Sequence, residues 1–435
     1  MKLKNILLAS GSAIVLSAAG ALADNNEAYL DQSGAGQSAS IDQSAGDTND
    51  AGSSSTPIAQ VGSNNDLEAI QSGDGNSIGL GSNVDDIADG VLQSHTGSPN
   101  AYRGNNLFID QSGDNNDVGS VVQRSSTQGS NTRNSASVEQ FGDGNSIESI
   151  YQKKRSSARN SLSANMSGND NVIARISQTA DQGGGGVNTI DVDISGNDNG
   201  TGSLRRFSDA TGATASWLIQ GKYASASPTD PSKNNSIDLL VTGSNNDFGV
   251  EQYGEDNSVG TLEINGNNNA VGVVQYGFNN TVALSSIDGG YNDVGIRQDG
   301  TGNWSTVTVA GSGHDFGVDQ MGDGNSATLD ISGHNNGWGT PYTNDALMGP
   351  ALATIGVSVN LERGVARQWG DDNTANLSQG GGQGNVFATL QDGNDNTIDG
   401  SQTGNLNAAV VAQLGSSNTA SYAQSGDGNS AGITQ

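Results

Sequence analysis

Short runs of alternating apolar and polar residues recur along the chain, and each run is followed by a polar turn. In NDFGVEQ (246–252) every second residue, beginning with the asparagine, lies on one face of an extended strand, and Glu251 lies on the other face. NDVGIRQ (292–298) repeats the arrangement, with Asp293 and Arg297 predicted to face outward. The pattern therefore predicts strands with one buried face and one charged, solvent-facing face.

A glycine followed three residues later by asparagine separates the strands at a nearly constant interval. From Gly243 to Gly333, and again from Gly370 to Gly426, such glycines recur without a gap at steps of about 11 residues. Glycine readily adopts the positive φ of a tight turn, and the short polar residues that follow it favour the same turn. The predicted turn glycines are Gly254, Gly277, Gly300, Gly322, Gly370, Gly393, Gly404, Gly415 and Gly426.

The residue two positions before each glycine indicates that the repeat is double. Between Gln252 and Ile331 this position alternates between glutamine and a branched aliphatic residue. Two strands of about 11 residues, loops included, then make one turn of about 22 residues. We therefore predict an all-β fold, a β-solenoid whose β-arch rungs of about 22 residues hold two strands each and stack in a cross-β, amyloid-forming arrangement.

Stacked rungs place the asparagines and glutamines of successive turns above one another at the ~4.8 Å spacing of paired strands. Because a side-chain amide both donates and accepts hydrogen bonds, such columns form ladders that support self-assembly. The predicted ladder residues are Gln252, Gln275, Gln298, Gln320, Asn257, Asn269, Asn280, Asn292, Gln368, Asn373, Gln379, Gln391, Asn396, Gln402, Asn407, Gln413, Asn418, Gln424, Asn429 and Gln435.

The composition mainly excludes certain partners and sites. With 64 glycines among 435 residues, 32% hydrophobic residues and a formal net charge of -29, an unpatterned chain of this kind is typically disordered, so the periodicity is what indicates a fold. Only 17 residues are Lys or Arg, which argues against nucleic acid as a partner. Cysteine is absent, which excludes disulfides and thiolate metal sites.

The segment 1–23 has the features of an export signal. Lys2 and Lys4 precede an apolar run over 6–16, and small residues follow at 21–23, so we expect cleavage after Ala23. No segment reaches the ~20 continuous apolar residues of a membrane span, and we expect a secreted mature chain. The expected domains are a signal peptide over 1–23, imperfect N-terminal repeats or a targeting segment over 24–61, a repeat solenoid with loop insertions over 62–336, an insertion over 337–367 and a regular repeat block over 368–435.

Four segments carry the pattern Q-x-G-x-x-N-x-A-x-x-x-Q in full. They are QWGDDNTANLSQ (368–379), QTGNLNAAVVAQ (402–413), QLGSSNTASYAQ (413–424) and QSGDGNSAGITQ (424–435). In this pattern the chain resembles the curlin repeat family, the subunits of bacterial curli fibres. Many central copies depart from the pattern, with Val, Ile or Phe in place of Ala.

The resemblance implies a structural subunit of an extracellular functional amyloid fibre, a pilus-like polymer of biofilm matrix used in cell adhesion and surface attachment. It implies export through the periplasm and an outer-membrane secretion pore, and assembly as a homopolymer on a nucleating curlin subunit at the cell surface. A minor nucleating fibre subunit and a cell-surface adhesin are alternatives within the same class. A monomeric β-solenoid that acts on polysaccharide or binds calcium is the alternative from another class.

Other residues are weaker candidates for a binding, metal or catalytic site. The basic cluster over 152–159 is predicted to be a solvated loop, with contact to an acidic surface as the alternative. Acidic turns invite a calcium site, but the aspartate is not a fixed position of the repeat. The histidines at 95, 314 and 334 are expected to be ladder or loop members, and paired carboxylates such as Asp371 and Asp372 to be exposed turn residues. We therefore predict no enzyme activity, no cofactor and no catalytic or metal-binding residue.

The regular block at the C-terminal end suggests where a fibre grows. Residues 402–435 contain neither proline nor a basic residue, both of which commonly block a strand edge. We expect these rungs to dock onto an incoming or nucleating subunit.

Overall fold

The computed structural model describes residues 7–8, 13–16, 25–81, 90–96, 104–126, 133–155, 157–180, 185–221, 232–283, 285–337 and 361–435. Strands dominate these residues, with one short helix, α1 (Arg206–Ala210). The chain divides into two compact units, which are described separately: unit 1 (Met1–Thr201, Ser216–Ile237, Tyr253–Glu255) and unit 2 (Gly202–Ala215, Asp238–Gln252, Asp256–Gln435).

In unit 1 the strands form two layers with parallel pairing inside each layer. Layer A contains β1 (Leu7–Leu8), β3 (Glu27–Ala28), β4 (Leu30–Ala35), β6 (Asp50–Ala51), β7 (Ile58–Ser63), β9 (Ser77–Ile78), β10 (Val91–His95), β12 (Asp117–Ser126), β14 (Ser146–Arg155), β16 (Val172–Ile173), β17 (Arg175–Ala180) and β19 (Trp217–Gly221). Layer B contains β2 (Ala13–Leu16), β5 (Ser38–Ala45), β8 (Asp66–Ser72), β11 (Asn106–Ser112), β13 (Asn134–Phe141), β15 (Arg159–Ser167) and β18 (Val187–Ser195).

Unit 2 is built in the same way, and β20 and β21 each contribute residues to both units. Its layer A contains β21 (Asp247–Glu255), β23 (Ala270–Phe278), β26 (Asp293–Thr301), β28 (Asp315–Met321), β30 (Val365–Trp369), β32 (Val386–Asp392), β34 (Ala408–Leu414) and β36 (Ser430–Thr434). Its layer B contains β20 (Ser236–Ser244), β22 (Ser258–Asn267), β24 (Thr281–Val282), β25 (Ser285–Gly290), β27 (Trp304–Ser312), β29 (Ser326–His334), β31 (Thr374–Gln383), β33 (Thr397–Thr403) and β35 (Thr419–Ser425).

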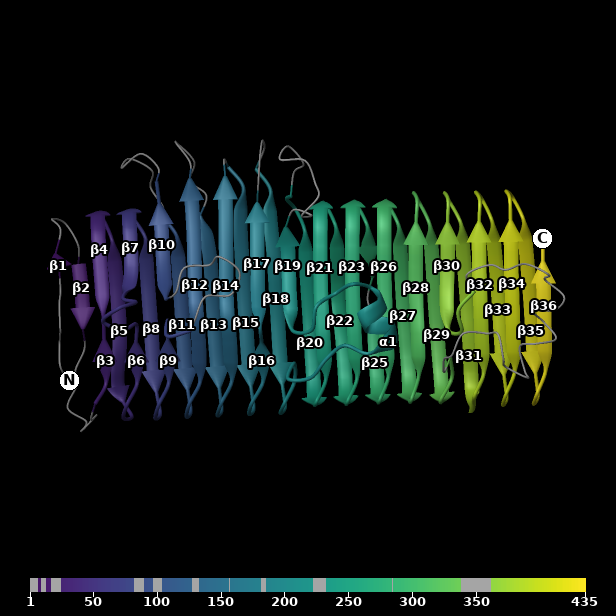
Figure 1. Cartoon of the computed structure of the whole chain (residues 1–435), viewed down its shortest axis with the longest axis horizontal. Helices are drawn as coiled ribbons and strands as arrows, with labels where there is room; N and C mark the ends of the chain where they lie inside the picture. The colour runs from purple at the N-terminus through teal and green to yellow at the C-terminus, as the bar shows by residue number, and fades with distance from the viewer. Residues whose placement is uncertain are drawn as a thin grey trace. The chain divides into compact units, whose positions relative to one another are not determined.

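The rungs follow the double repeat of the sequence. Gln275 aligns with Gln298 and Gln298 with Gln320, so neighbouring strands of layer A are one double repeat apart in the chain. Within each unit, the strands of layer A point one way and those of layer B the other way, because the chain reverses at each glycine turn (Figure 1). The parallel, in-register stacking confirms the predicted all-β solenoid with two strands in each rung.

The core of each unit lies between its two layers. In unit 2 the inward column of β23, β26 and β28 runs through Val271, Val294 and Phe316, all of which are buried. The ring of Phe316 stacks on that of Phe387, with 5.6 Å between the ring centroids. Since one rung contributes only a few such side chains, its burial depends on the rungs above and below.

A segment of unit 2 leaves the rungs and covers the outer face of layer A. This segment, residues 202–215 and hereafter the strap, includes α1 and contacts β23, β26 and β28 (Figure 1). Outward-facing glycines make room for it, since an added Cβ atom at Gly272 would overlap the carbonyl oxygen of Ser208, and one at Gly295 that of Phe207. The strap backbone therefore lies directly on the sheet.

Two outward carboxylates lie beneath the strap. Asp293 accepts hydrogen bonds from the backbone amides of Phe207 (2.7 Å) and Ser208 (3.0 Å), and Glu251 accepts one from Thr214 N (2.8 Å). Their exposed fractions are only 2% and 5%, so the prediction that Asp293 and Glu251 face solvent is wrong. Both side chains do point away from the core, but the strap covers them because its backbone amides need acceptors.

The basic cluster over 152–159 also differs from its prediction. Strand β14 continues to Arg155, and β15 begins at Arg159, so the described residues of the cluster do not form the predicted solvated loop. Lys154 aligns with Ser125 of β12 and Ala180 of β17, and these longer strands bury its side chain. Burial lowers the pKa of Lys154 to about 8, because the charged ammonium loses its hydration.

Candidate self-assembly site

A continuous row of glutamines runs along layer A of unit 2. Each Nε2 donates to the Oε1 of the glutamine on the next strand, at 2.8–3.1 Å. The members are Gln252, Gln275, Gln298, Gln320, Gln368, Gln391, Gln413 and Gln435. Members such as Gln298 have no exposed surface, so each amide depends on its neighbours for its hydrogen bonds.

Layer B of unit 2 carries a shorter row. Gln379 donates to Gln402, and Gln402 donates to Gln424 at 2.7 Å. On the preceding strands the same position holds an aliphatic column, Ile264, Ile287, Val309 and Ile331, which continues in register onto Gln379. The alternation between Gln and Ile or Val in the sequence thus distinguishes the strands of layer A from those of layer B in this part of the chain.

The predicted asparagines line two columns at the ends of the strands. In one column, Asn280 donates to Asn257 Oδ1 from both its backbone and side-chain nitrogen (3.1 Å each), and it also donates to Gly300 O (2.9 Å). Asn373, Asn396 and Asn418 continue this column. The other column includes Asn269, Asn292, Asn407 and Asn429. Before the last rung, each of these asparagine side chains therefore joins two rungs and also donates to the carbonyl of a turn glycine.

His314 takes an asparagine position in the second column. Its backbone amide donates to Asn292 Oδ1 (3.0 Å), its Nδ1 accepts from Asn336 N (3.2 Å), and its Nε2 lies 3.0 Å from Gly333 O. These contacts fit a neutral ring with the proton on Nε2. Burial lowers the pKa of His314, in the direction of the neutral ring.

Acid should therefore weaken this column. Below the ordinary histidine pKa the unfolded chain binds a proton that the folded ring resists, so stability falls as the pH drops through that range towards the lowered folded-state pKa. We expect His314→Asn to remove this part of the pH dependence, as followed by denaturant midpoints between pH 7.5 and about 5. The exposed His334→Asn change is the control. An unchanged acid dependence in His314→Asn would contradict the assigned role.

The predicted turn glycines also form columns. All nine have positive φ, between 99° and 138°. An added Cβ atom at Gly300 would overlap the carbonyl oxygen of Gly322, and one at Gly322 that of Gly370. Backbone conformation and close approach of the next rung thus both require glycine at Gly300 and Gly322, whereas at Gly415 and Gly426 only the backbone conformation does.

The paired carboxylates lie where a turn role predicts them. Asp371 and Asp372 are exposed; Asp371 Oδ1 accepts from Asp323 N of the adjacent turn at 2.9 Å, and Asp372 has a φ of 56°.

Among the described residues, no group of three or more His, Asp or Glu side chains is arranged to hold a metal ion. No described helix is long and apolar enough to cross a membrane.

Strands β35 and β36 each have one strand neighbour in the described chain, β33 and β34 respectively. Gln435 N donates to Ala412 O, and Asn418 O accepts from Thr397 N. In a parallel strand the residues alternate between the two sides, so Thr419, Ser421 and Ala423 of β35 present their backbone groups to the open edge. Ser430, Gly432 and Thr434 of β36 do the same. The described rungs thus end in two rows of unpaired backbone donors and acceptors.

Further ladder members lie in unit 1 and are absent from the set predicted from the sequence. The glutamines Gln32, Gln60, Gln93, Gln123, Gln152, Gln178 and Gln220 donate one to the next at 2.6–3.0 Å. A shorter row joins Gln43, Gln71, Gln111 and Gln140. Five of these glutamines, Gln32, Gln60, Gln71, Gln111 and Gln140, stand two residues before a glycine, which is the sequence signal that could have identified them; the other six lack it.

Comparison with known proteins gives one family. The model of the curlin associated repeat matches residues 291–321 and 393–421. Both matches lie in unit 2 and include ladder glutamines and turn glycines described above. A search of the curated proteins finds no match to the chain.

Proposed function

We propose that this chain, which carries curlin associated repeats, is a structural subunit of a curli-type extracellular fibre and polymerises by stacking its rungs end to end. The observation that carries the proposal is the open edge of β35 and β36, where backbone groups and both glutamine rows come to an end together. A strand edge of this kind is a template for another chain.

The direction of the ladders supports a head-to-tail contact. Every glutamine bond described above runs from Nε2 of the lower-numbered residue to Oε1 of the higher-numbered one. Gln424 and Gln435 each donate one Nε2 hydrogen to a backbone carbonyl and have the second one left for a further rung. On the first glutamine-bearing strands of unit 1, Gln32 Oε1 and Gln43 Oε1 are buried without a hydrogen-bond partner. Donors on the last rungs of unit 2 and acceptors on the first rungs of unit 1 favour contact between unlike rungs of two subunits, because two like rungs offer the same group.

Strands β1 and β2 pair with β4 and β5, which hold these acceptors. Both lie within the segment predicted to be the export signal. We propose that cleavage after Ala23 frees β4 and β5 for the incoming subunit. The family resemblance further supports a homopolymer in biofilm matrix with roles in adhesion, exported through an outer-membrane pore and started by a nucleating curlin subunit. A nucleating role for this chain itself remains the alternative.

Proline at the open edge should stop growth. Ser421→Pro and Gly432→Pro each remove a backbone donor that points to the edge and leave the pairing with β33 and β34 in place. We expect each to reduce the rate of seeded elongation at fixed monomer concentration by about tenfold or more, since one lost edge bond and the ring clash recur at every addition.

Ser421→Thr and Gly432→Ala are the matched controls, because each changes the side chain at the same position and keeps the backbone donor. Gly432 is not among the glycines with positive φ, so alanine fits its backbone conformation. Both controls should elongate at a rate close to that of the unmodified chain. Unchanged elongation in both proline variants would show that growth uses another surface.

A further inference from the structure

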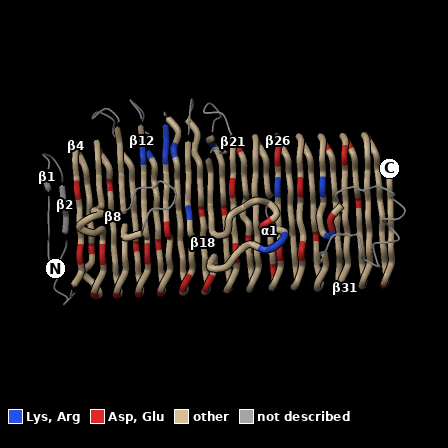
Figure 2. Tube along the Cα trace, viewed as in Figure 1, with Lys and Arg blue, Asp and Glu red and all other residues tan. Residues whose placement is uncertain are grey.

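Unit 2 gathers all of its positive charge in one region. Its only basic residues are five arginines, Arg205, Arg206, Arg297, Arg363 and Arg367. Two belong to the strap, and the other three lie on β26, on β30 or just before β30. Figure 2 shows blue segments in and near α1 and on nearby strands of this unit, where the rest of the trace is red or tan. Because the repeat itself needs no basic residue, such clustering indicates that these charges have a local role.

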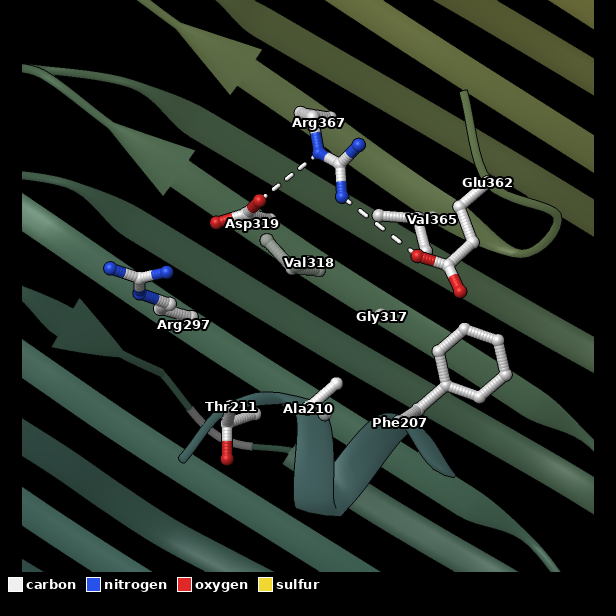
Figure 3. A pocket seen from close by; sticks show the side chains of 11 residues that line it. Phe207, Ala210, Thr211, Arg297, Gly317, Val318, Asp319, Glu362, Val365 and Arg367 are labelled. Carbon is white, nitrogen blue, oxygen red and sulfur yellow. Dashed lines mark hydrogen bonds and ion pairs between the residues drawn. The ribbon is translucent and has the colours of Figure 1, made fainter. Parts of the chain in front are cut away.

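A cavity of about 70 Å³ lies in the middle of this region. Its floor is the outer face of β26 and β28 at Gly295, Gly317 and Val318. The strap forms one wall with Phe207 and Ala210, and the segment with Glu362 and Val365 forms the opposite wall (Figure 3). The outward glycines beside the strap thus leave a hollow that is lined on two sides.

The charged groups of the cavity are paired, either with one another or with a neighbouring residue outside the lining. Arg367 Nε donates to Asp319 at 3.0 Å, and Glu362 accepts from Arg206 at 2.8 Å. Arg297 lies 3.3 Å from Asp299. A ligand with a net charge would have to compete with these pairs, so the lining favours a neutral ligand.

Two buried polar atoms of the lining residues have no hydrogen-bond partner. They are Arg297 Nε, a donor, and Asp319 Oδ1, an acceptor. The two residues are aligned on the adjacent strands β26 and β28. A hydroxyl group can accept from the first and donate to the second, which neither a carboxylate nor an ammonium group can do.

We propose that this cavity binds one ring of a neutral sugar. The two atoms are buried in the free protein, whereas the two side chains are partly exposed, so binding includes a rotation of these side chains that presents the donor of Arg297 and the acceptor of Asp319 to hydroxyl groups at the edge of the ring. The apolar face of the ring lies against Phe207 and Val365. The volume, about twice that of one liquid water, admits the hydroxyl-bearing edge of a ring and leaves the rest outside. The proposal does not depend on fibre formation.

The test uses the full mature chain as a freshly prepared monomer and neutral methyl glycosides of the common hexoses, followed by saturation-transfer NMR. For a ligand of this size we expect millimolar dissociation constants for at least one glycoside. Glucuronate and inorganic phosphate serve as charged probes. Binding of the charged probes in preference to every neutral glycoside, or binding of none of the probes, would overturn the proposal.

A pair of matched variants separates the cavity from the rest of the surface. Ala210→Trp fills the cavity from an exposed position and should abolish binding, whereas Asp209→Trp, exposed on the same helix but outside the lining, should leave it intact. Arg297→Gln and Asp319→Asn should each weaken binding by about fivefold or more, as expected for loss of a charged hydrogen-bonding partner. Equal binding by Ala210→Trp and Asp209→Trp would place the sugar elsewhere and refute the assignment.

Discussion

Gly300→Ala is expected to destabilise unit 2 by about 3 kcal/mol and to slow fibre growth. Gly300 has a φ of 138°, a conformation that residues with a Cβ atom rarely adopt. The added methyl group would also overlap the carbonyl oxygen of Gly322 on the next rung. Because rungs stack directly, the clash cannot be relieved without separating β26 from β28. Denaturant unfolding of the monomer and seeded elongation measure the two effects.

Gly302→Ala in the same turn is the matched control. Its φ is 71°, in the left-handed region, and nothing lies within 4 Å of its Cβ position. Only the conformational cost of about 1 kcal/mol should appear. Gly302→Asn should cost less still, since Asn279 holds the corresponding place in another turn with a φ of 56°. Equal losses for Gly300→Ala and Gly302→Ala would show that the next rung does not restrict Gly300.

Gln298→Leu is expected to cost about 3 kcal/mol as well, for a different reason. The side chain accepts from Gln275 (2.8 Å) and donates to Gln320 (2.9 Å) and to Thr281 O (3.1 Å). Leucine fills a similar volume but leaves these buried partners unsatisfied. The aliphatic column of layer B shows that an unbroken apolar row is acceptable. The loss of stability is therefore expected because one leucine interrupts a row of amides. We expect slower seeded elongation and faster amide exchange at β23 and β28.

Thr308→Leu introduces the same residue at an exposed, outward position of β27. It should leave the unfolding midpoint and the elongation rate close to those of the unmodified chain. Comparable lag times for Gln298→Leu and Thr308→Leu would mean that the amide row does not contribute to assembly.

Much of the architecture can be predicted from the sequence because each rung repeats the same local rules. The spacing of glycines predicts the turns, and the position two residues before them distinguishes Gln298 in one layer from Val309 in the other. In a parallel stack the neighbours of a residue are its own equivalents, so a column can be predicted without knowledge of distant contacts. His314 follows this rule, since its place in the repeat is that of an asparagine and its contacts lie in the asparagine column.

The strap could not be predicted in this way, because its contacts depend on a segment that leaves the repeat. Glu251 and Asp293 have the outward positions expected from alternation, yet a neighbouring segment buries them. A signal was present in the outward glycines Gly272, Gly295 and Gly317, which recur in register where a solvent-facing strand has no need of glycine. Lys154 is similar, since β14 continues past the end of the repeat and its alternation turns a basic side chain inward.

The sugar cavity lies beyond sequence reasoning for the same reason. Arg297 and Asp319 are recognisable as outward charges, but Phe207 comes from the strap and Glu362 from the segment before β30. Only the folded unit brings these four side chains around one hollow.

Fibre diffraction from the purified mature chain, after incubation at high concentration, tests the central claim most directly. Axial stacking of the rungs predicts a meridional reflection at about 4.8 Å, from the spacing of the strands, and an equatorial reflection near 10 Å, from the two layers. A chain that stays monomeric for days under these conditions, or fibres without the reflection at about 4.8 Å along their axis, would contradict it.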